Sequence, residues 1–301
     1  MVGAAEGPPV TSRWLVTGAG GMLGRDLVEV LSARPEVALT AADRSALDIT
    51  DASAVTDAVA GHDVVVNAAA WTDVDGAEAR EDAATAVNGD AVVHLARACA
   101  AAGARLLHVS TDYVFSGSPE GGFPEDSEPA PLNAYGRSKL RGELAVLASR
   151  AYVVRTAWLY GEHGRNFVAT VLRLSTSRDT LDVVDDQTGQ PTWSLAVAQR
   201  LAALGDAALA GRAAPGAYHA TASGQTTWYG LARAVFEEAG LDPGRVRPTT
   251  SDAYPRPARR APYSVLRDDR FPALGHPPLP DWRSMLHDAF ARLSLSAHAR
   301  R

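Results

Sequence analysis

A glycine-rich turn between a short apolar run and an amphipathic helix constrains the fold of this chain more than any other feature. The apolar run Trp14–Thr17 leads directly into a turn whose glycines are spaced three residues apart: Gly18, Gly21 and Gly24. The next stretch is apolar on one helical face, at Leu23, Leu27, Val30 and Leu31. Small residues allow a tight turn, and the first turn of such a helix offers free N–H groups and a positive dipole end. This arrangement is typical of a pyrophosphate-binding site.

Four further runs of apolar and β-branched residues follow at intervals of about one helix: Val37–Thr40, Asp63–Asn67, Leu106–Ser110 and Tyr152–Thr156. Runs that are apolar on both faces and separated by helical stretches favour a parallel sheet covered by helices. The sequence therefore predicts an α/β fold with a Rossmann-type, doubly wound parallel sheet.

The second half of the chain loses this alternation, because prolines between positions 191 and 280 divide it into short pieces. One amphipathic helix is expected there, around Trp228, Leu231 and Val235. We predict a dinucleotide-binding domain over residues 13–165 and a smaller mixed α/β substrate lobe over 166–293, with segments near 190–235 able to return to the sheet. Residues 1–12 and 294–301 are expected to be mobile ends.

Charge and hydropathy exclude several classes of protein. The 29 Lys and Arg residues against 35 Asp and Glu give a net charge of −6, which argues against nucleic-acid binding through bulk positive charge. No stretch approaches the roughly 18 consecutive apolar residues of a membrane span, and the first residues lack the basic and apolar regions of a signal peptide. A cytoplasmic protein is therefore expected.

Asp43 lies about 20 residues beyond the glycines, where dinucleotide sites place a carboxylate for the ribose hydroxyls. Arg44 follows immediately and offers a guanidinium to a 2′-phosphate. The pair therefore leaves NADH and NADPH both open as cofactors. Without the preceding glycines, a solvated loop pair would be the preferred interpretation.

A tyrosine and a lysine follow the fourth run at a spacing that places them on one helix face: Tyr135 and Lys139. A phenol titrates near pH 10, and a nearby ammonium group stabilises the phenolate, so such a pair can exchange a proton closer to neutral pH. Thr111, at the end of the fourth run, offers a hydroxyl to the same reacting oxygen. Alone, this spacing is common on exposed helices, but here it follows a dinucleotide-type turn.

These residues resemble the extended short-chain dehydrogenase/reductases. Within them, the sequence is similar to the dTDP-4-dehydrorhamnose reductase family, and five segments carry the likeness: Asn67–Asp75, Ser110–Phe115, Pro131–Gly136, Arg155–Tyr160 and Ala253–Arg260. The resemblance extends from about residue 13 to Phe290. Antibiotic-sugar reductases such as dihydrostreptose synthases share these segments.

The resemblance implies a role for each matching residue. Tyr135 would give a proton to the 4-keto oxygen, Lys139 would lower the pKa of Tyr135 and hold the nicotinamide ribose, and Thr111 would bond the same oxygen. Cofactor-contacting positions are matched by Gly21, Met22, Leu23, Asp43, Ala70, Trp71 and Thr72. The positions that hold the sugar are matched by Thr111, Asp112 and Trp158.

Further substrate contacts are less specific. Asn166 and Gln187 match family segments near the sugar, although the polarity of loops explains them nearly as well. Arg259 and Arg260 are expected to bind the nucleotide diphosphate, because a planar guanidinium pairs bidentately with phosphate oxygens. Solvation at the surface is the alternative for both.

Bound metal is not expected. Some bacterial members of the family hold Mg²⁺ with glutamates across a dimer interface, and the matching positions here are Asp26, Leu195 and Asp288. Because an apolar side chain is no ligand for a hard cation, we predict a monomer or a metal-independent homodimer.

The function implied is NADH- or NADPH-dependent reduction of the 4-keto group of a dTDP-4-keto-6-deoxyhexose. The first expectation is conversion of dTDP-4-dehydro-L-rhamnose to dTDP-L-rhamnose. The alternatives are a reductase of another 4-keto or branched nucleotide sugar in antibiotic biosynthesis, an epimerase or dehydratase, and a non-catalytic regulatory subunit that binds a dinucleotide.

Overall fold

The computed structural model describes residues 12–117 and 121–293. The ends predicted to be mobile lie outside these ranges, except for Ser12, which begins the first strand. At the centre is a six-stranded sheet with the order β2–β1–β3–β4–β5–β10, in which every neighbouring pair is parallel. Its strands are β1 (Ser12–Thr17), β2 (Val37–Ala42), β3 (Val64–Asn67), β4 (Arg105–Thr111), β5 (Tyr152–Thr156) and β10 (Gly216–His219).

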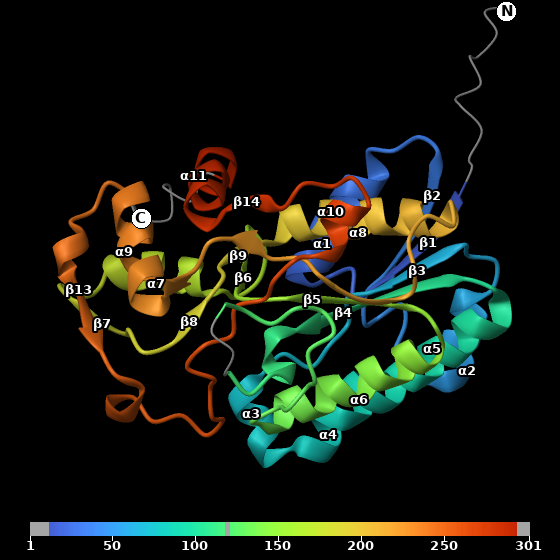
Figure 1. The fold of residues 1–301 in the computed structure, drawn as a ribbon, viewed down its shortest axis with the longest axis horizontal. Coiled ribbons are helices and arrows are strands. Elements are labelled where there is room, and N and C mark those ends of the chain that lie inside the picture. Colours follow the sequence, from blue (N-terminus) through green and yellow to red (C-terminus); the bar gives the residue numbers. More distant parts are fainter. Residues whose placement is uncertain (1–11, 118–120, 294–301) are drawn as a thin grey trace, which may run out of the picture.

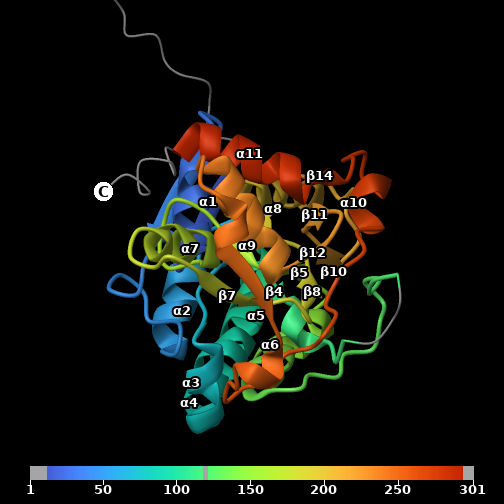
Figure 2. The same ribbon diagram turned by 90° about the vertical axis from the view of Figure 1, so that its left-hand side faces the viewer.

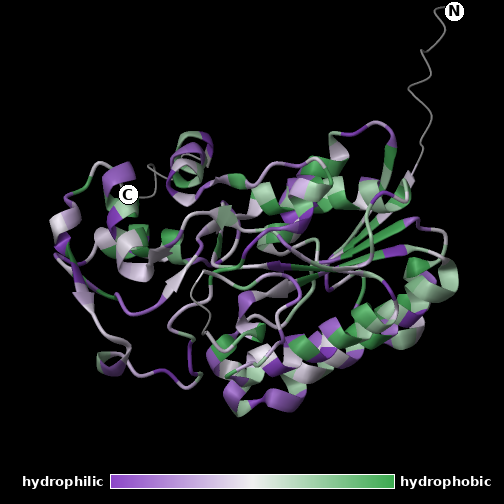
Figure 3. Cartoon of the chain, in the orientation of Figure 1, coloured by the Kyte–Doolittle hydropathy of each residue, from purple (hydrophilic) through white to green (hydrophobic). Residues whose placement is uncertain are grey.

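Both faces of this sheet are buried, as the apolar runs predicted. In β1, Trp14 and Val16 belong to the core on one face and Leu15 to the core on the other, because successive side chains of a strand point in opposite directions. β3 repeats this alternation with three valines. In Figure 3 the strands of the sheet are accordingly among the most hydrophobic parts of the chain.

Helices cover the two faces in layers (Figure 1). One layer contains α1 (Met22–Ser32) and α8 (Ser194–Leu209), which pack on each other and on the sheet. The opposite layer is formed by α2 (Ala52–Val59), α5 (Ala91–Ala102) and α6 (Ala134–Ala148), with the shorter α3 (Val74–Ala79), α4 (Glu81–Thr85) and the π-helical turn η1 (Ala86–Asp90). Across the described part of the chain, no helix has the length and apolarity needed to cross a membrane.

A second group of short elements lies at the end of the sheet that faces the viewer in Figure 2. Its strands form four two-stranded pairs: β6 (Leu159–Tyr160) with β9 (Thr192–Trp193), β7 (Leu181–Val184) with β13 (Val246–Thr249), β8 (Thr188–Gly189) with β12 (Thr226–Thr227), and β11 (Ala222–Ser223) with β14 (Leu279–Asp281). The helices here are α7 (Phe167–Ser175), α9 (Trp228–Glu238) and α11 (Trp282–Leu293). A separate apolar core lies among them.

Residues 194–219 lie on the central sheet although they follow residue 165. Strand β10 pairs with β5 at the sheet edge, and α8 covers the face that contains Trp14. Gly205 of α8 permits this approach, because a Cβ there would lie 2.1 Å from the Trp14 ring. A short helix, α10 (Arg270–Ala273), also contacts β10. The division into two domains stays a prediction.

The carboxyl ends of β1 and β3 meet where the connections change direction along the sheet. Open α/β sheets bind ligands at such a switch point. Gly18 follows β1 with φ of +71°, and a Cβ there would lie 2.5 Å from the backbone nitrogen of Ala69. The turn therefore accepts only glycine, and it leaves an opening above the sheet edge.

Candidate active site

A cleft of about 1040 Å³ opens at this edge, between the sheet and the short elements beyond it. Its volume suits a dinucleotide together with part of a substrate. The predicted residues that line it are Gly18, Gly21, Met22, Leu23, Gly24, Asp43, Arg44, Ala70, Thr72, Thr111, Asp112, Tyr135, Lys139 and Trp158.

The glycine turn gives the cleft an anion-binding end. Helix α1 begins at Met22, and no side chain caps the N-terminus at Gly21, so the N–H groups of the first turn remain for a ligand. Gly24 packs against the turn so closely that a Cβ would lie 2.1 Å from the carbonyl oxygen of Gly18. These features fit a pyrophosphate, and the structure supplies them from backbone alone.

Asp43 and Arg44 line the cleft directly after β2. The Asp43 Oδ1 atom accepts hydrogen bonds from the Ser45 hydroxyl at 2.7 Å and from the backbone N–H groups of Ser45 and Ala46 at 2.9 and 3.1 Å. These bonds lower the pKa of Asp43, with the Ser45 hydroxyl contributing most. Asp43 thus offers a fixed carboxylate to ribose hydroxyls, while the exposed Arg44 lines the same cleft.

Trp71 lies beside the cleft but does not line it. Its indole Nε1 donates to the carbonyl of Asp73 at 2.9 Å, and the Arg80 guanidinium lies 4.6 Å from the ring centroid. Asn88 holds the Trp71 backbone at both ends: its Oδ1 accepts from the Trp71 N–H at 2.9 Å, and its Nδ2 donates to the Trp71 carbonyl at 3.0 Å. Trp71 therefore supports the strand-end loop that carries Ala70 and Thr72.

Thr111, Asp112 and Tyr135 come together where β4 ends. The Thr111 hydroxyl donates to Asp112 at 3.0 Å, and the Ser264 hydroxyl donates to the other carboxylate oxygen at 2.6 Å. Burial raises the pKa of Asp112 to about 6 against these two hydrogen bonds. Burial also raises the pKa of Tyr135, as do Asp112 and Tyr113, while a hydrogen bond with Thr111 opposes the change. Tyr135 is therefore a neutral phenol at neutral pH.

Lys139 lies one helical turn beyond Tyr135 and is only 2% exposed. Its Nζ donates to the carbonyl of Val109 at 2.7 Å. Burial lowers the pKa of Lys139 to about 8, and Glu143 on the same helix opposes this change. That Lys139 lowers the pKa of Tyr135 stays a prediction.

Trp158 lines both the cleft and a smaller adjoining pocket. Its backbone has φ of +45°, which is rare for a bulky residue and marks local strain. The indole stacks on Trp228 with ring centroids 3.5 Å apart, and a Cβ at Gly189 would lie 2.4 Å from it. The Trp228 Nε1 donates to Gln187 at 3.2 Å, and Gln187 Nε2 donates to Ser251 at 2.8 Å.

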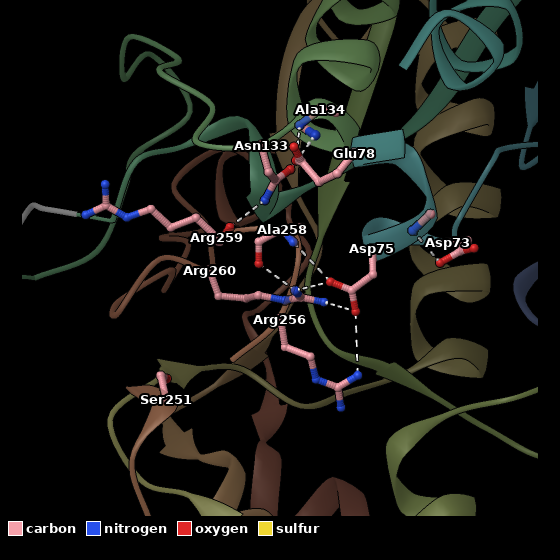
Figure 4. Close-up of polar contacts among 12 residues, drawn as sticks. Asp73, Asp75, Glu78, Asn133, Ala134, Ser251, Arg256, Ala258, Arg259 and Arg260 are labelled. Carbon is pink, nitrogen blue, oxygen red and sulfur yellow. Dashed lines mark hydrogen bonds and ion pairs between the residues drawn. The ribbon is translucent and has the colours of Figure 1, made fainter. Parts of the chain in front are cut away.

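The structure brings Arg260 to the smaller pocket but not the side chain of Arg259 (Figure 4). The Arg260 guanidinium donates to both carboxylate oxygens of Asp75, at 2.5 and 3.0 Å, and Arg256 lies 3.6 Å from the same carboxylate. Arg259 is exposed, and its backbone oxygen accepts from Asn133 at 2.8 Å. In Figure 4 the Arg259 side chain points away from this cluster.

Asn166 lies outside both linings. Its Oδ1 accepts from the Ala169 N–H at 2.9 Å, which caps the N-terminus of α7, and its Nδ2 donates to the carbonyl of Gly161 at 3.0 Å. The residue is also buried. Asn166 therefore has a structural partner for each end of its amide.

Comparison with known proteins agrees with this geometry. The model of the RmlD substrate binding domain family matches residues 12–295. The chain belongs to this family, that of the dTDP-4-dehydrorhamnose reductases. It is 55% identical to a dTDP-4-dehydrorhamnose reductase of Streptomyces griseus over 93% of this chain and 94% of that one.

A dTDP-4-keto-6-deoxy-D-glucose reductase of Streptomyces niveus is 47% identical, with 95% of this chain and 99% of that one covered. A solved dTDP-4-dehydrorhamnose reductase from Bacillus anthracis str. Ames, in complex with NADP, aligns with a TM-score of 0.86 at 33% identity and covers 93% of this chain and 99% of that one. The predicted Rossmann-type fold class and the predicted family are thereby confirmed.

The three positions that match the magnesium-binding glutamates of the reductase family differ in burial and in side-chain chemistry. Asp26 is buried and accepts a hydrogen bond from the Ser194 hydroxyl, Leu195 is buried, and Asp288 is exposed. Among residues 12–117 and 121–293, no three His, Cys, Asp or Glu side chains gather as a metal site. Independence from metal stays a prediction.

Local sequence patterns did not point to three residues that organise this reductase site: Asp75, Asn88 and Trp228. Asp75 and Trp228 lie in segments that the sequence patterns single out, but their partners are distant in sequence. Asp75 contacts Arg260 across 185 positions. A signal for Asn88 was absent, because a single amide in an Ala-rich helix has no pattern of its own.

Proposed function

We propose that this protein reduces the 4-keto group of a dTDP-4-keto-6-deoxyhexose with NADH or NADPH. One observation carries the proposal: the glycine turn that fits a pyrophosphate and the buried Thr111 and Tyr135 line the same cleft. The relatives' names point to the same reaction class. The first substrate we propose is dTDP-4-dehydro-L-rhamnose, with dTDP-L-rhamnose as product.

A bound nicotinamide dinucleotide supplies the hydride that reaches the carbonyl carbon. The chain supplies the proton: Tyr135, kept as a neutral phenol by burial, gives its hydroxyl proton to the 4-keto oxygen as that oxygen gains negative charge. The carbonyl thus becomes an alcohol by addition of one hydride and one proton. Thr111 donates a hydrogen bond to the same oxygen when its hydroxyl turns from Asp112.

Lys139 holds the nicotinamide ribose in this proposal. Its Nζ is fixed by Val109 on one side, so its other N–H groups are available to the cleft that it lines. Its carbon chain is buried beside β4, which limits the positions the amine can reach. We expect this geometry to orient the ribose rather than to contact the sugar.

The substrate's nucleotide would lie across the smaller pocket. The stacked Trp158 and Trp228 rings offer an aromatic face, and the Arg260 guanidinium offers a phosphate the N–H groups that are not bound to Asp75 and Ala258. Arg260 is already held in place by Asp75, so its guanidinium needs little ordering upon binding.

A second candidate is a reductase of a different 4-keto sugar. The likeness to the Streptomyces niveus enzyme, which is named for a 4-keto-6-deoxy-D-glucose substrate, favours keeping it. The intact Thr111, Tyr135 and Lys139 argue against a non-catalytic regulatory subunit. The cytoplasmic location and the state of monomer or homodimer stay predictions.

The test is oxidation of NADPH and of NADH by the purified protein with enzymatically generated dTDP-4-keto-L-rhamnose, followed by identification of the product. Fast oxidation with dTDP-L-rhamnose as product supports the first substrate and ranks the two cofactors. Fast oxidation only with dTDP-4-keto-6-deoxy-D-glucose supports the second candidate. No turnover with either sugar, while dinucleotide still binds, overturns the proposed reaction.

Tyr135→Phe tests the proton donor directly. We expect a loss of turnover of at least about a hundredfold, the usual size of a general-acid contribution, with dinucleotide affinity almost unchanged. Tyr152→Phe is the matched control, because it removes a buried phenol whose hydroxyl donates to the Ala213 carbonyl within the core. Full activity of Tyr135→Phe would assign the proton to another group.

A further inference from the structure

Below Lys139, three buried side chains from neighbouring strands form a hydrogen-bonded row. The Thr17 hydroxyl of β1 donates to Asn67 Oδ1 of β3 at 2.7 Å, and Asn67 Nδ2 lies 2.9 Å from His108 Nδ1 of β4. His108 Nε2 lies 3.3 Å from Lys139 Nζ. Thr17, Asn67 and His108 are at most 1% exposed.

The backbone fixes the orientation of the Asn67 amide. The Ala69 N–H donates to Asn67 Oδ1 at 3.2 Å, and a backbone N–H has no other capacity. The oxygen of the amide is therefore on the side of Ala69 and Thr17, and its NH2 group faces His108. Because an amide nitrogen only donates, His108 Nδ1 must accept, and it carries no proton.

The imidazole is neutral, so its single proton is on Nε2. Burial lowers the pKa of His108 well below its ordinary value, and Lys139 lowers it further. The Nε2–H group therefore points at the Lys139 amine, which is itself a donor when charged. Of the two protein groups within hydrogen-bond distance of Nζ, only the Val109 carbonyl accepts.

We propose that Asn67 and His108 are positioning residues for Lys139: Asn67 holds His108 in the Nε2–H tautomer, and His108 thereby withholds an acceptor from the Lys139 ammonium group. The consequence is directional. The ammonium keeps one N–H on Val109 and turns the others into the cleft, toward the bound ribose. The inference rests on the proposed function for the role of Lys139, but the tautomer itself does not.

The ionisable groups around Lys139 come from two elements. His108 faces it from β4, while Tyr135 precedes it and Glu143 follows it by one turn of α6. Glu143 is bound by Arg155 at 2.8 Å, so its charge is compensated within the core. His108 is therefore the neighbour whose proton position can change the charge of Lys139 without altering the net charge of the site.

Asn67→Asp reverses the tautomer while preserving the shape of the side chain. One carboxylate oxygen keeps the bonds from Thr17 and Ala69, and the other can accept only from an Nδ1–H group of His108. His108 Nε2 then becomes an acceptor for the ammonium of Lys139. We expect the pKa of Lys139, read from the alkaline limb of the pH profile of turnover, to rise by about one unit, which is a tenfold change in its proton affinity.

His108→Gln separates this effect from the negative charge that Asn67→Asp adds. Its amide oxygen can reach Lys139 as a neutral acceptor, so the alkaline limb should rise in this variant also. If only Asn67→Asp shifts the limb, a simple charge effect replaces the proposal. Lower activity at every pH with no shift in either variant would show a merely structural role and overturn it.

Nitrogen NMR of histidine-labelled protein reads the tautomer without turnover. The signals of His108 are assigned by their loss in His108→Gln. We expect the Nε2–H form in the native chain and the Nδ1–H form in Asn67→Asp. An Nδ1–H form or a charged imidazole in the native chain would overturn the proposal. Because this readout needs no substrate, failure of the proposed function leaves it intact.

Discussion

The sheet half and the short-stranded end of this molecule are held together in different ways. The sheet half contains six hydrogen-bonded strands in one continuous sheet, and helices bury both of its faces. At the other end, the strands of the described residues form two-stranded pairs around a smaller core. A two-stranded ribbon is marginal by itself. The short elements therefore depend on helix packing and on polar contacts that reach back to the sheet half.

This difference separates the two tasks of the site. The dinucleotide cradle is built mostly from backbone of the sheet half, where a Cβ would collide with the backbone that follows β3 at Gly18 and with the turn itself at Gly24. The groups assigned to the nucleotide sugar come from loops whose places are fixed by pairs such as Asp75 with Arg260 and Gln187 with Trp228. Cofactor binding should thus be lost when a substitution creates a steric collision in the turn. Substrate binding should be weakened when a single polar contact between loops is removed.

The largest expected effect is that of Gly18→Ala in the sheet half. The new Cβ would lie 2.5 Å from the Ala69 nitrogen at a left-handed φ, and neither backbone can yield. We expect the free energy of unfolding to fall by about 3 kcal/mol or more, with loss of dinucleotide binding. Urea denaturation and dinucleotide titration measure both.

Gly103→Ala is the matched control for that substitution. Its φ of +72° is nearly the same, but nothing lies within 4 Å of the new Cβ. The cost should be about 1 kcal/mol, from backbone conformation alone. Equal costs at Gly18 and Gly103 would show that conformation, rather than the close approach of two strand ends, selects the glycine in the turn.

Asp112, where the two halves meet, should lower stability at neutral pH. Burial raises its pKa from 3.8 to about 6, so the folded state binds this proton more tightly than the unfolded state does. The resulting stability is present below about pH 4 and is lost as pH rises through 6. We expect Asp112→Asn to be more stable than the native chain by up to about 3 kcal/mol above pH 7, with equal stability below pH 4.

Thermal unfolding across pH measures this gain, and turnover should fall in the same variant because Thr111 loses its carboxylate partner. Asp51→Asn provides a contrast: the hydrogen bonds from Ser53 and Ala54 lower the pKa of Asp51, so its stabilisation is lost as pH falls. A gain above pH 7 in Asp51→Asn as well would contradict burial as the cause at Asp112.

Asp75→Asn tests the substrate side alone. It removes the ionic partner of Arg260 and Arg256, and the loop that carries them then has weaker anchorage to α3. We expect KM for the sugar nucleotide to rise about tenfold, equivalent to about 1.4 kcal/mol, with kcat and dinucleotide affinity nearly unchanged.

Asp90→Asn is the control, since it removes an exposed ion pair with Arg141 and should change neither constant. A lower KM in Asp75→Asn would mean that Asp75 competes with the substrate for Arg260 instead of holding it for the substrate.

The smallest expected effects come from helix caps, one in each half. The Asp51 carboxylate caps α2 by accepting from Ser53 and Ala54, and the Thr227 hydroxyl caps α9 by accepting from the Gly230 N–H. Replacing either residue by Ala should lower the midpoint of thermal unfolding slightly, because a backbone N–H at the start of the helix loses its acceptor. If the halves unfold together, both variants lower one common transition. Two transitions, each lowered by only one variant, would show that the halves unfold separately.

The sequence predicted the sheet half closely because its signals are local. The five apolar runs correspond to β1 to β5, and the glycine turn opens α1 as expected. Tyr135 and Lys139 lie in one helix, so their shared face followed from helical spacing. Strand β10 was not predicted, because it has only four residues and these form no run of apolar or β-branched side chains.

The substrate side was less predictable, and the reason is visible in particular residues. Arg259 and Arg260 are adjacent in sequence and chemically identical, yet only Arg260 meets Asp75 and the pocket. Trp228 was expected as one apolar position of a helix, but Trp158, held in a left-handed conformation, brings the two rings into contact. Neither partner lies near the other in the chain.

What the sequence by itself determined is the alternation of strands and helices, the glycine turn and the placement of Tyr135 and Lys139 on one helix face, because each depends on neighbours within a few residues. What only the tertiary structure decided is which polar side chains meet: Asp75 with Arg260, Ser264 with Asp112, and Asn67 with His108. Those contacts join residues from 41 to 185 positions apart. Their geometry is set by how whole elements pack, which no local pattern specifies.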